Sequence, residues 1–271
     1  MLRAIRSLWR DPEIEARVHR LEIGFNRHGY DRFGASRRDL TRFLSLLSWL
    51  YRHYFRVHVH DIHHVPARGR AMLVGNHSGG VALDGAMVLA SVFLELEPPR
   101  LAQGMAEYFL ARWPFLADWT VKCGQLTGLP DHAVQLLEDE RLLLVFPEGA
   151  RGTAKLAWQQ HTLVRFGTGF VRLALQTRAP IVPFAFLGGG DAIPTIVNLE
   201  RLGRALGAPY IPLTPYVVPL PLPKVRLDIV YGEPMTFDGD GSEEDRVIEQ
   251  YVDRVKQRIA ELLAAGEEKR R

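Results

Sequence analysis

Cysteine is almost absent from this sequence of 271 residues, in which Cys123 stands alone. A single cysteine excludes an internal disulfide framework and any zinc site built from several thiolates, and it is typical of a reducing compartment. We interpret Cys123 as a lone small apolar residue, because the histidine and asparagine partners of a cysteine nucleophile are not evident.

Long hydrophobic runs are missing as well. No stretch approaches 18 consecutive apolar residues, so we expect no membrane-spanning helix. The first 20 residues are interrupted by charge every few positions and lack the apolar core of a signal peptide. These features predict a cytoplasmic protein, unless another feature recruits it elsewhere.

Several familiar motifs do not occur. The sequence has no G-x-S-x-G nucleophile elbow and neither of the glycine-rich phosphate-binding motifs, G-x-x-x-x-G-K-[ST] or G-x-G-x-x-G. The segment HVHDIHH (58–64) could hold zinc. However, its first two histidines share one face of a short strand, and its last two fall in the turn before Pro66. The strand explains this spacing without a metal, so we predict no metal site.

Positive charge is concentrated at one end of the chain. Residues 1–60 contain 12 arginines, no lysine and 6 acidic residues, whereas the rest carries a small net negative charge. A basic segment ahead of a mildly acidic body indicates an anionic partner, either nucleic acid or a lipid surface. We expect no nucleic-acid partner, because no motif for binding one is recognisable.

Two segments are candidates for membrane contact. The run 37–57 interleaves arginines with leucine and aromatic side chains, over an apolar stretch too short to span a bilayer. This combination is typical of a helix that lies in the membrane surface. A core helix with its arginines on the solvent side is the alternative. The proline-rich segment 210–224 has no period that would bury its apolar groups, and its alternative is an extended segment packed on the body.

Short apolar runs alternate with helical patterns along most of the chain. We expect strands near 56–60, 71–75, 141–146, 180–190 and 225–232. Helices are expected near 81–96, 102–119, 131–140, 161–177 and 242–266. This alternation predicts an α/β fold with a largely parallel sheet flanked by helices. Since residues 1–55 contain no strand, we predict a helical, basic, membrane-docking appendage at 1–55 and an α/β domain at 56–271.

A candidate base follows one of these strands. In NHSGGVALD (76–84), His77 comes after a buried strand and before a helix, which places its imidazole at the carboxyl edge of the sheet. Asp84 could accept a hydrogen bond from one ring nitrogen and fix the tautomer. In a continuous helix the two residues would lie about 10 Å apart along the axis, so they can meet only if the chain folds back at Gly79 and Gly80. The alternative is a helix N-cap region with a satisfied histidine.

A second polar segment follows another strand. In VFPEGARGTAK (145–155), Glu148, Arg151 and Lys155 lie in a loop with two glycines, whose backbone amides can approach an anion closely. The guanidinium of Arg151 offers a planar fork for phosphate. The alternative is a surface turn with an ion pair.

The order of these blocks is specific. NH…D, then FPEGAR, then APIVPF closely resembles the glycerolipid (lysophospholipid) acyltransferase superfamily, over about residues 56–236. Within that superfamily, NHSGG and the runs 165–184 and 219–234 are most similar to a branch related to diacylglycerol and phytyl-ester acyltransferases.

The resemblance implies an O-acyltransferase that moves a fatty acyl group from acyl-CoA or acyl carrier protein to the hydroxyl of a glycerolipid or related lipid alcohol, with no other cofactor. It implies His77 as general base and Asp84 as its orienting partner. It also implies direct attack, because no serine or cysteine nucleophile belongs to the motif. The residues that it assigns to substrate binding are Asn76, Gly124, Glu148, Gly149, Arg151 and Pro183.

Two departures from the family pattern affect these assignments. The usual first block is H-x-x-x-x-D, whereas six residues separate His77 from Asp84 here. In the second block, Pro130 stands where an arginine for the acceptor phosphate would be, which favours a less charged acceptor such as a mono- or diacylglycerol. A lipid acceptor predicts a protein that is peripheral on a membrane. A thioesterase-like hydrolase and a noncatalytic lipid-binding module are the alternative functions.

Overall fold

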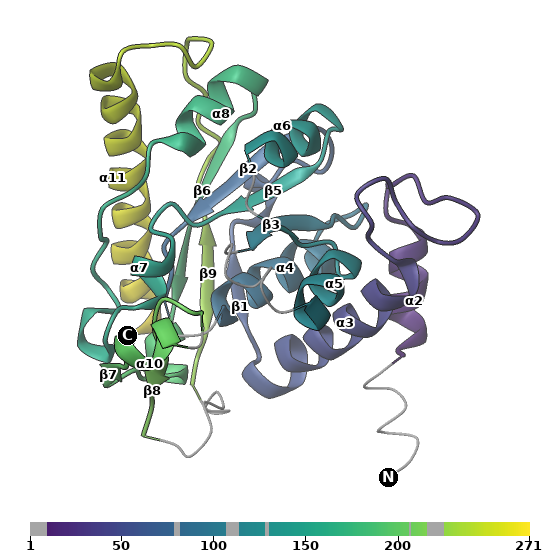
Figure 1. The fold of residues 1–271 in the computed structure, drawn as a ribbon, viewed down its shortest axis with the longest axis horizontal. Coiled ribbons are helices and arrows are strands. Elements are labelled where there is room, and N and C mark those ends of the chain that lie inside the picture. The colour runs from purple at the N-terminus through teal and green to yellow at the C-terminus, as the bar shows by residue number, and fades with distance from the viewer. Residues whose placement is uncertain (1–9, 79–81, 107–113, 128–129, 206, 216–224) are drawn as a thin grey trace.

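The structure is a computed structural model that describes residues 10–78, 82–106, 114–127, 130–205, 207–215 and 225–271. A seven-stranded sheet has the order β1-β9-β6-β2-β5-β3-β4 (Figure 1). Its strands are β1 (His58–His60), β2 (Ala71–Gly75), β3 (Ala102–Ala106), β4 (Leu126–Thr127), β5 (Leu142–Val145), β6 (Ile181–Leu187) and β9 (Asp228–Tyr231). Two more short strands, β7 (Val197–Asn198) and β8 (Pro212–Leu213), pair with each other.

Helices cover both faces of the sheet (Figure 1). The longer helices are α2 (Pro12–His19), α3 (Arg37–Trp49), α4 (Leu83–Glu95), α5 (Pro114–Lys122), α6 (Pro130–Glu138), α8 (Gly169–Thr177) and α11 (Asp245–Arg270). The short ones are α7 (Ala150–Thr153), α9 (Gly189–Ala192) and α10 (Glu200–Ala205). Helices α6, α8 and α11 cover one face, and α4 covers the other, with α3 and α2 packed in the same layer.

The side chains of β2 show how the sheet builds two cores. Ala71 and Leu73 belong to the apolar cluster of α4, whereas Met72 and Val74 belong to that of α6, α8 and α11. Successive side chains of a strand point to opposite faces, so a strand that is apolar at every position must be covered on both sides. All four side chains are fully buried.

Strand direction determines which chain segments meet at the edge near His77. Neighbouring strands are parallel throughout the sheet, except that β9 runs antiparallel to β6. The carboxyl ends of β2, β5 and β6 therefore lie at one edge, which they share with the amino ends of β1 and β9.

The expected fold class is confirmed: the sheet is largely parallel and helices flank it. Two local expectations are wrong. Residues 102–106 form β3 rather than part of a helix, because they pair with β5 in the interior of the sheet. The helix expected at 161–177 begins only at Gly169, because the N–H groups of Val164 and Gly167 bond to Glu148 and Pro147 in the segment after β5.

The N-terminal residues are helical in the described part and pack against the α/β body. Val18 of α2 and Leu40 and Leu44 of α3 are buried in the same apolar cluster as Leu73 and Phe93. A π-helical turn at Leu50–Phe55 follows α3 directly. The division at residues 55 and 56 stays a prediction, but its two sides share a core. Among the described residues, no helix is long and apolar enough to cross a membrane.

Candidate active site

Asn76 fastens the end of β2 to the neighbouring strand β6. Its side-chain amide donates to the carbonyl of Phe186 at 2.9 Å, and its side-chain oxygen accepts from the N–H of the same residue at 2.8 Å. The side chain is fully buried. It therefore continues the strand pairing by one step, and both of its polar ends are occupied by Phe186 rather than turned toward a substrate.

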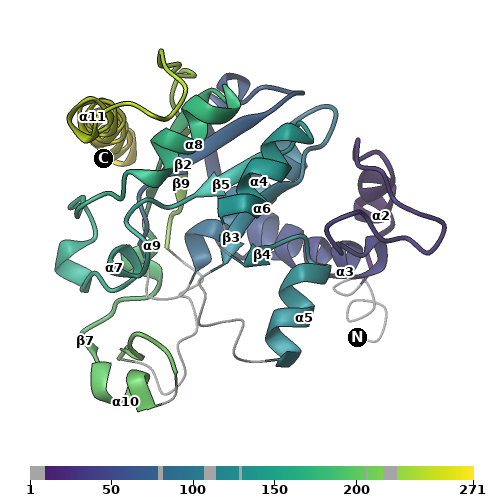
Figure 2. The same cartoon turned by 45° about the horizontal axis from the view of Figure 1, so that its top comes forward.

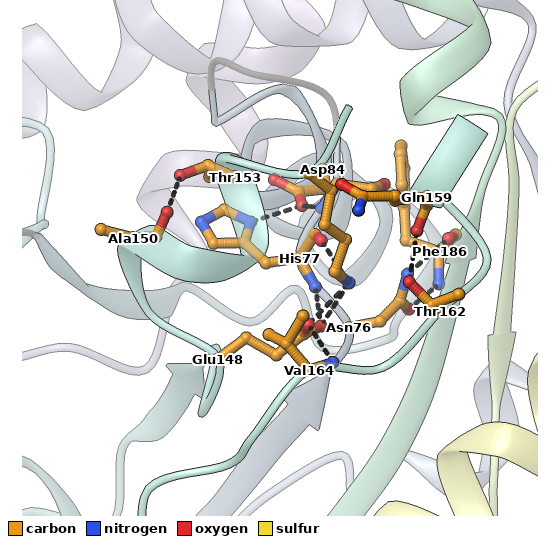
Figure 3. Close-up of polar contacts among 12 residues, drawn as sticks. Asn76, His77, Asp84, Glu148, Ala150, Thr153, Gln159, Thr162, Val164 and Phe186 are labelled. Atoms are coloured by element: carbon orange, nitrogen blue, oxygen red, sulfur yellow. Dashed lines mark hydrogen bonds and ion pairs between the residues drawn. The ribbon is translucent and has the colours of Figure 1, made fainter. Parts of the chain in front are cut away.

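His77 comes next, and its side chain contacts that of Asp84 directly. Nδ1 of His77 lies 2.5 Å from Oδ2 of Asp84, at the start of α4 (Figure 3). The same oxygen accepts from the N–H of Ser78 at 2.7 Å, and the other oxygen accepts from the N–H of Gly85 at 2.7 Å. The fold-back that we predict at Gly79 and Gly80 concerns residues outside the described part of the chain. The six-residue spacing is thus compatible with a direct contact between the two side chains.

This contact assigns the proton of the imidazole. A carboxylate accepts hydrogen bonds, so Nδ1 carries a proton and Nε2 of a neutral ring is left as an acceptor. Figure 3 shows the second ring nitrogen turned away from Asp84, toward the side of α7 where Ala150 and Thr153 lie. The ring also stacks on Phe146, with centroids 4.1 Å apart. The imidazole of His77 therefore has a defined tautomer and a defined plane at the edge of the sheet.

Glu148 is buried beneath the histidine rather than exposed in a binding loop. Its side chain has no exposed surface, and it forms an ion pair with Lys155. Oε1 accepts from the N–H of His77 at 3.0 Å, and Oε2 accepts from the N–H of Val164 at 3.0 Å. The surface turn with an ion pair that the sequence left open is therefore a buried ion pair, which also holds the N–H groups of His77 and Val164.

The loop after β5 turns at Gly149 and continues into α7. Gly149 has φ 56° and ψ −151°, a backbone conformation that residues other than glycine rarely adopt. The turn sets Gly152 against the histidine, since a Cβ there would lie 2.6 Å from Cβ of His77. Arg151 is exposed on α7, and no described residue forms a hydrogen bond or ion pair with it. Its guanidinium is therefore available to a substrate anion.

Two of the predicted binding residues lie away from His77. Gly124 is in the turn between α5 and β4, with φ 78°, and its carbonyl accepts from Gln103. Because β4 is three strands from β2, that turn is about 14 Å away across the sheet. Pro183 is buried within β6 in register with Val74, before the strand reaches the edge. The structure gives both residues a role in packing.

The cysteine and two of the histidines of segment 58–64 are buried or contact other residues of the fold. Cys123 is buried, and this burial raises the pKa of its thiol to about 12. His60 contacts Asp228 at 3.1 Å, and His64 contacts the carbonyl of Tyr231 at 2.9 Å. In the part of the chain that the structure describes, no group of three potential metal ligands comes together.

The contact between Lys155 and the carbonyl of His77 was not predicted from the sequence. The two residues are 78 positions apart, and only the folded chain brings them together.

The sequence is similar to that of several known proteins. Residues 56–187 match the sequence model of the Acyltransferase family. An uncharacterized protein of Mycobacterium tuberculosis is 32% identical over 230 residues, and one of Mycobacterium leprae is 31% identical over 229 residues. Each alignment covers 80% of this chain. The chain spans 63% and 62% of the length of these two relatives.

A solved structure has a similar fold. The crystal structure of the 1-acyl-sn-glycerophosphate acyltransferase PlsC from Thermotoga maritima superposes with a TM-score of 0.50 over 82% of each chain, at 17% identity. This likeness concerns the fold. The family match covers both segments that follow β2 and β5, and hence the histidine, the aspartate and the buried ion pair. Residues 56–187, just under half of the chain, therefore match the Acyltransferase family, and the fold is similar to that of a glycerophosphate acyltransferase.

Proposed function

We propose that this protein transfers a fatty acyl group from a thioester, acyl-CoA or acyl carrier protein, to the hydroxyl of a lipid alcohol. The observation that carries the proposal is the 2.5 Å contact between Nδ1 of His77 and the buried Asp84, which leaves Nε2 as the proton acceptor. In the reaction, the acceptor hydroxyl gives its proton to Nε2 while its oxygen attacks the thioester carbonyl. Collapse of the tetrahedral intermediate breaks the C–S bond, and the departing sulfur takes the proton from the imidazolium.

Direct attack is supported by the surroundings of the one thiol. The thiolate is the nucleophilic form of cysteine, and a thiol with a pKa of about 12 is protonated at neutral pH. Cys123 also precedes the turn at Gly124, on the far side of β3 from His77. The acceptor oxygen is therefore the nucleophile of the proposed reaction.

A weakly charged acceptor fits the positive groups near His77. Arg151 is the exposed cation of the loop after β5, and Pro130, which stands where the family pattern has an arginine, is exposed at the start of α6. With one of two phosphate-binding arginines missing, we infer a mono- or diacylglycerol or a related alcohol as acceptor. The similarity to the diacylglycerol and phytyl-ester branch favours the same class.

Because the proposed acceptor is a lipid, we infer that the protein works at a membrane surface. The exposed apolar side chains of the structure suggest a different set of membrane-contacting residues from the run 37–57 expected from the sequence. Most of the apolar side of α3 faces the core, so of the run 37–57 only Leu46 and Trp49 are large apolar side chains with substantial exposure. Helix α5, which packs on α3, adds Phe115 and Trp119, exposed to 92% and 47%. We propose these four side chains and Leu116 as the docking patch, on the cytoplasmic side of the membrane.

The segment 210–224 is only partly described, since 216–224 lie outside the described residues. Residues 212 and 213 form β8, which pairs with β7. Exposed apolar side chains also occur on and beside this pair and on α10, which projects to the same side of the molecule as α5 in Figure 2. A contact of this second region with lipid stays a prediction.

Product analysis tests the proposed reaction. Purified protein is incubated with isotopically labelled acyl-CoA and a panel of lipid alcohols, and products are identified by mass spectrometry. We expect acylated neutral acceptors. Efficient acylation of lysophosphatidate with none of the neutral acceptors would overturn the acceptor class. Free fatty acid as the only product would indicate a thioesterase, and lipid binding without turnover a noncatalytic module.

The histidine and aspartate are tested as one unit. His77→Ala is expected to lower kcat by about 10²- to 10⁴-fold, because the proton acceptor is lost. Asp84→Asn is expected to lower kcat in the same range, and the double variant should lose no more than His77→Ala alone. The matched control is His60→Ala, which removes a histidine paired with Asp228 away from the site and should retain kcat. An Asp84→Asn enzyme with normal kcat would contradict the proposed role.

The thiol is tested separately. At about pH 8, iodoacetamide should leave Cys123 unmodified in the folded protein and label it after denaturation, because burial raises the pKa of the thiol. Cys123→Ala should retain acyl transfer. Loss of activity in this variant, together with an acylated Cys123 in the wild-type mass spectrum, would show a covalent pathway instead.

Membrane docking is tested by point substitution, because deleting residues 1–55 would also remove buried parts of the core. Phe115→Ser with Trp119→Ser should reduce binding to sedimenting liposomes by about tenfold or more, since two large apolar groups lose their contact with lipid. Tyr30→Ser is the control, because its exposure of 39% equals that of Trp49 but it lies outside the docking patch. Equal binding of both variants would place docking elsewhere.

A further inference from the structure

Lys155 is a buried cation at the end of the loop that follows β5. Its side chain is 2% exposed. Nζ lies 2.8 Å and 2.6 Å from the two carboxylate oxygens of Glu148, and 3.0 Å from the carbonyl oxygen of His77. Two of the three N–H donors of this ammonium form hydrogen bonds, to Oε1 of Glu148 and to the carbonyl of His77, and Oε2 of Glu148 lies within ion-pair distance. Because the side chain is also buried, this lysine acts on the reaction through its neighbours rather than by contact with a substrate.

Lys155 and Glu148 hold the two ends of the same residue. The carboxylate of Glu148 accepts a hydrogen bond from the N–H of His77 at 3.0 Å, and the ammonium of Lys155 donates one to the carbonyl of His77. The backbone of His77 is therefore held on both sides, independently of the contacts of its ring with Asp84 and Phe146. The bond between Val164 and Glu148 anchors this arrangement to a third chain segment.

Stability alone does not account for a buried ion pair. Removing two charges from water is costly, and a pair of apolar side chains of similar volume is often as stable or more stable. Burial lowers the pKa of Lys155 from its usual range, which reflects the same desolvation. The charged groups that face its ammonium are Glu148, Asp84 and, from α11, Lys256. The pair provides something that apolar packing lacks, namely directed hydrogen bonds to the peptide groups of His77.

We propose that Lys155 is a positioning residue that, with Glu148, fixes the backbone of His77 so that its imidazole meets Asp84 on one side and the acceptor hydroxyl on the other. The proposal rests on the acyl-transfer function given above. Lys155 touches no reacting atom. Its contribution is the orientation of the base, and a displacement of about 1 Å at such a site can cost about 100-fold in rate.

A single substitution does not separate positioning from folding. Lys155→Met leaves the Glu148 carboxylate buried without its counter-ion, so this variant should be destabilised whatever the role of the lysine. The double variant Glu148→Gln/Lys155→Met removes both charges at similar volume. Its glutamine can still accept from the N–H of His77, whereas methionine cannot donate to the carbonyl. Folding and positioning are therefore affected differently in the two variants.

The expected result is a recovery of stability without a recovery of rate. The double variant should regain most of the Tm that Lys155→Met loses, yet its kcat should stay about 100-fold below wild type, with KM for donor and acceptor nearly unchanged. Wild-type kcat at recovered Tm would overturn the proposal, because the lysine would then serve folding only. A raised KM with normal kcat would also overturn it, because the pair would then bind substrate.

A spectroscopic measurement keeps the test independent of turnover. The hydrogen-bonded Nδ1 proton of His77 should give a protected downfield NMR resonance in the wild type that weakens or exchanges faster in the double variant. The ring proton of His60 that faces Asp228 serves as the internal reference and should not change. An unchanged His77 resonance would contradict positioning. If wild type transfers no acyl group to any acceptor, the proposed function fails, and this comparison still decides the role of Lys155.

Discussion

The hydrogen bond from His77 to Asp84 is the interaction on which the proposed chemistry depends. A neutral imidazole has two tautomers, and only the one with its proton on Nδ1 presents Nε2 to an acceptor hydroxyl. Asp84 selects this tautomer, and its own position is set by backbone N–H groups at Ser78 and Gly85. The folded backbone therefore orients the base before any substrate arrives.

Two buried carboxylates flank the histidine, and their partners give them different tasks. Asp84 faces the ring, so it can stabilise the imidazolium that forms when the acceptor loses its proton. Glu148 faces a lysine and the peptide N–H of the same histidine, so its charge is already balanced in the free protein. A change of charge on the imidazole is thus met by Asp84, while Glu148 and Lys155 keep the backbone in place. In the proposed reaction, Asp84 supports the change of charge on the imidazole and Glu148 supports the position of the His77 backbone.

Much of the fold and the pairing of the histidine could be predicted from the sequence, because strand ends and motif order are local features. The carboxyl end of β2 could be predicted from a short apolar run, and the contact of His77 with Asp84 from the order of the motif. Other features depend on contacts between distant segments. Residues 102–106 contain glycine and no β-branched side chain, so only pairing with the neighbouring strands β5 and β4 makes them a strand. Buried Glu148 accepts a hydrogen bond from Val164, which is 16 positions away.

The N-terminal arginines show why charge counts alone do not identify a lipid-binding surface. Arg17 is buried and donates to the carbonyls of Phe93 and Leu96, and Arg52 pairs with Glu13, so part of the basic excess serves the fold. An amphipathic helix such as α3 has the same pattern whether its apolar side meets a core or a bilayer. Exposure in the folded chain separates the two cases. By that measure, Phe115 and Trp119 on α5 are stronger candidates for lipid contact than the buried leucines of α3. Transfer into lipid lowers the free energy only of an apolar group that is exposed to water in the folded protein.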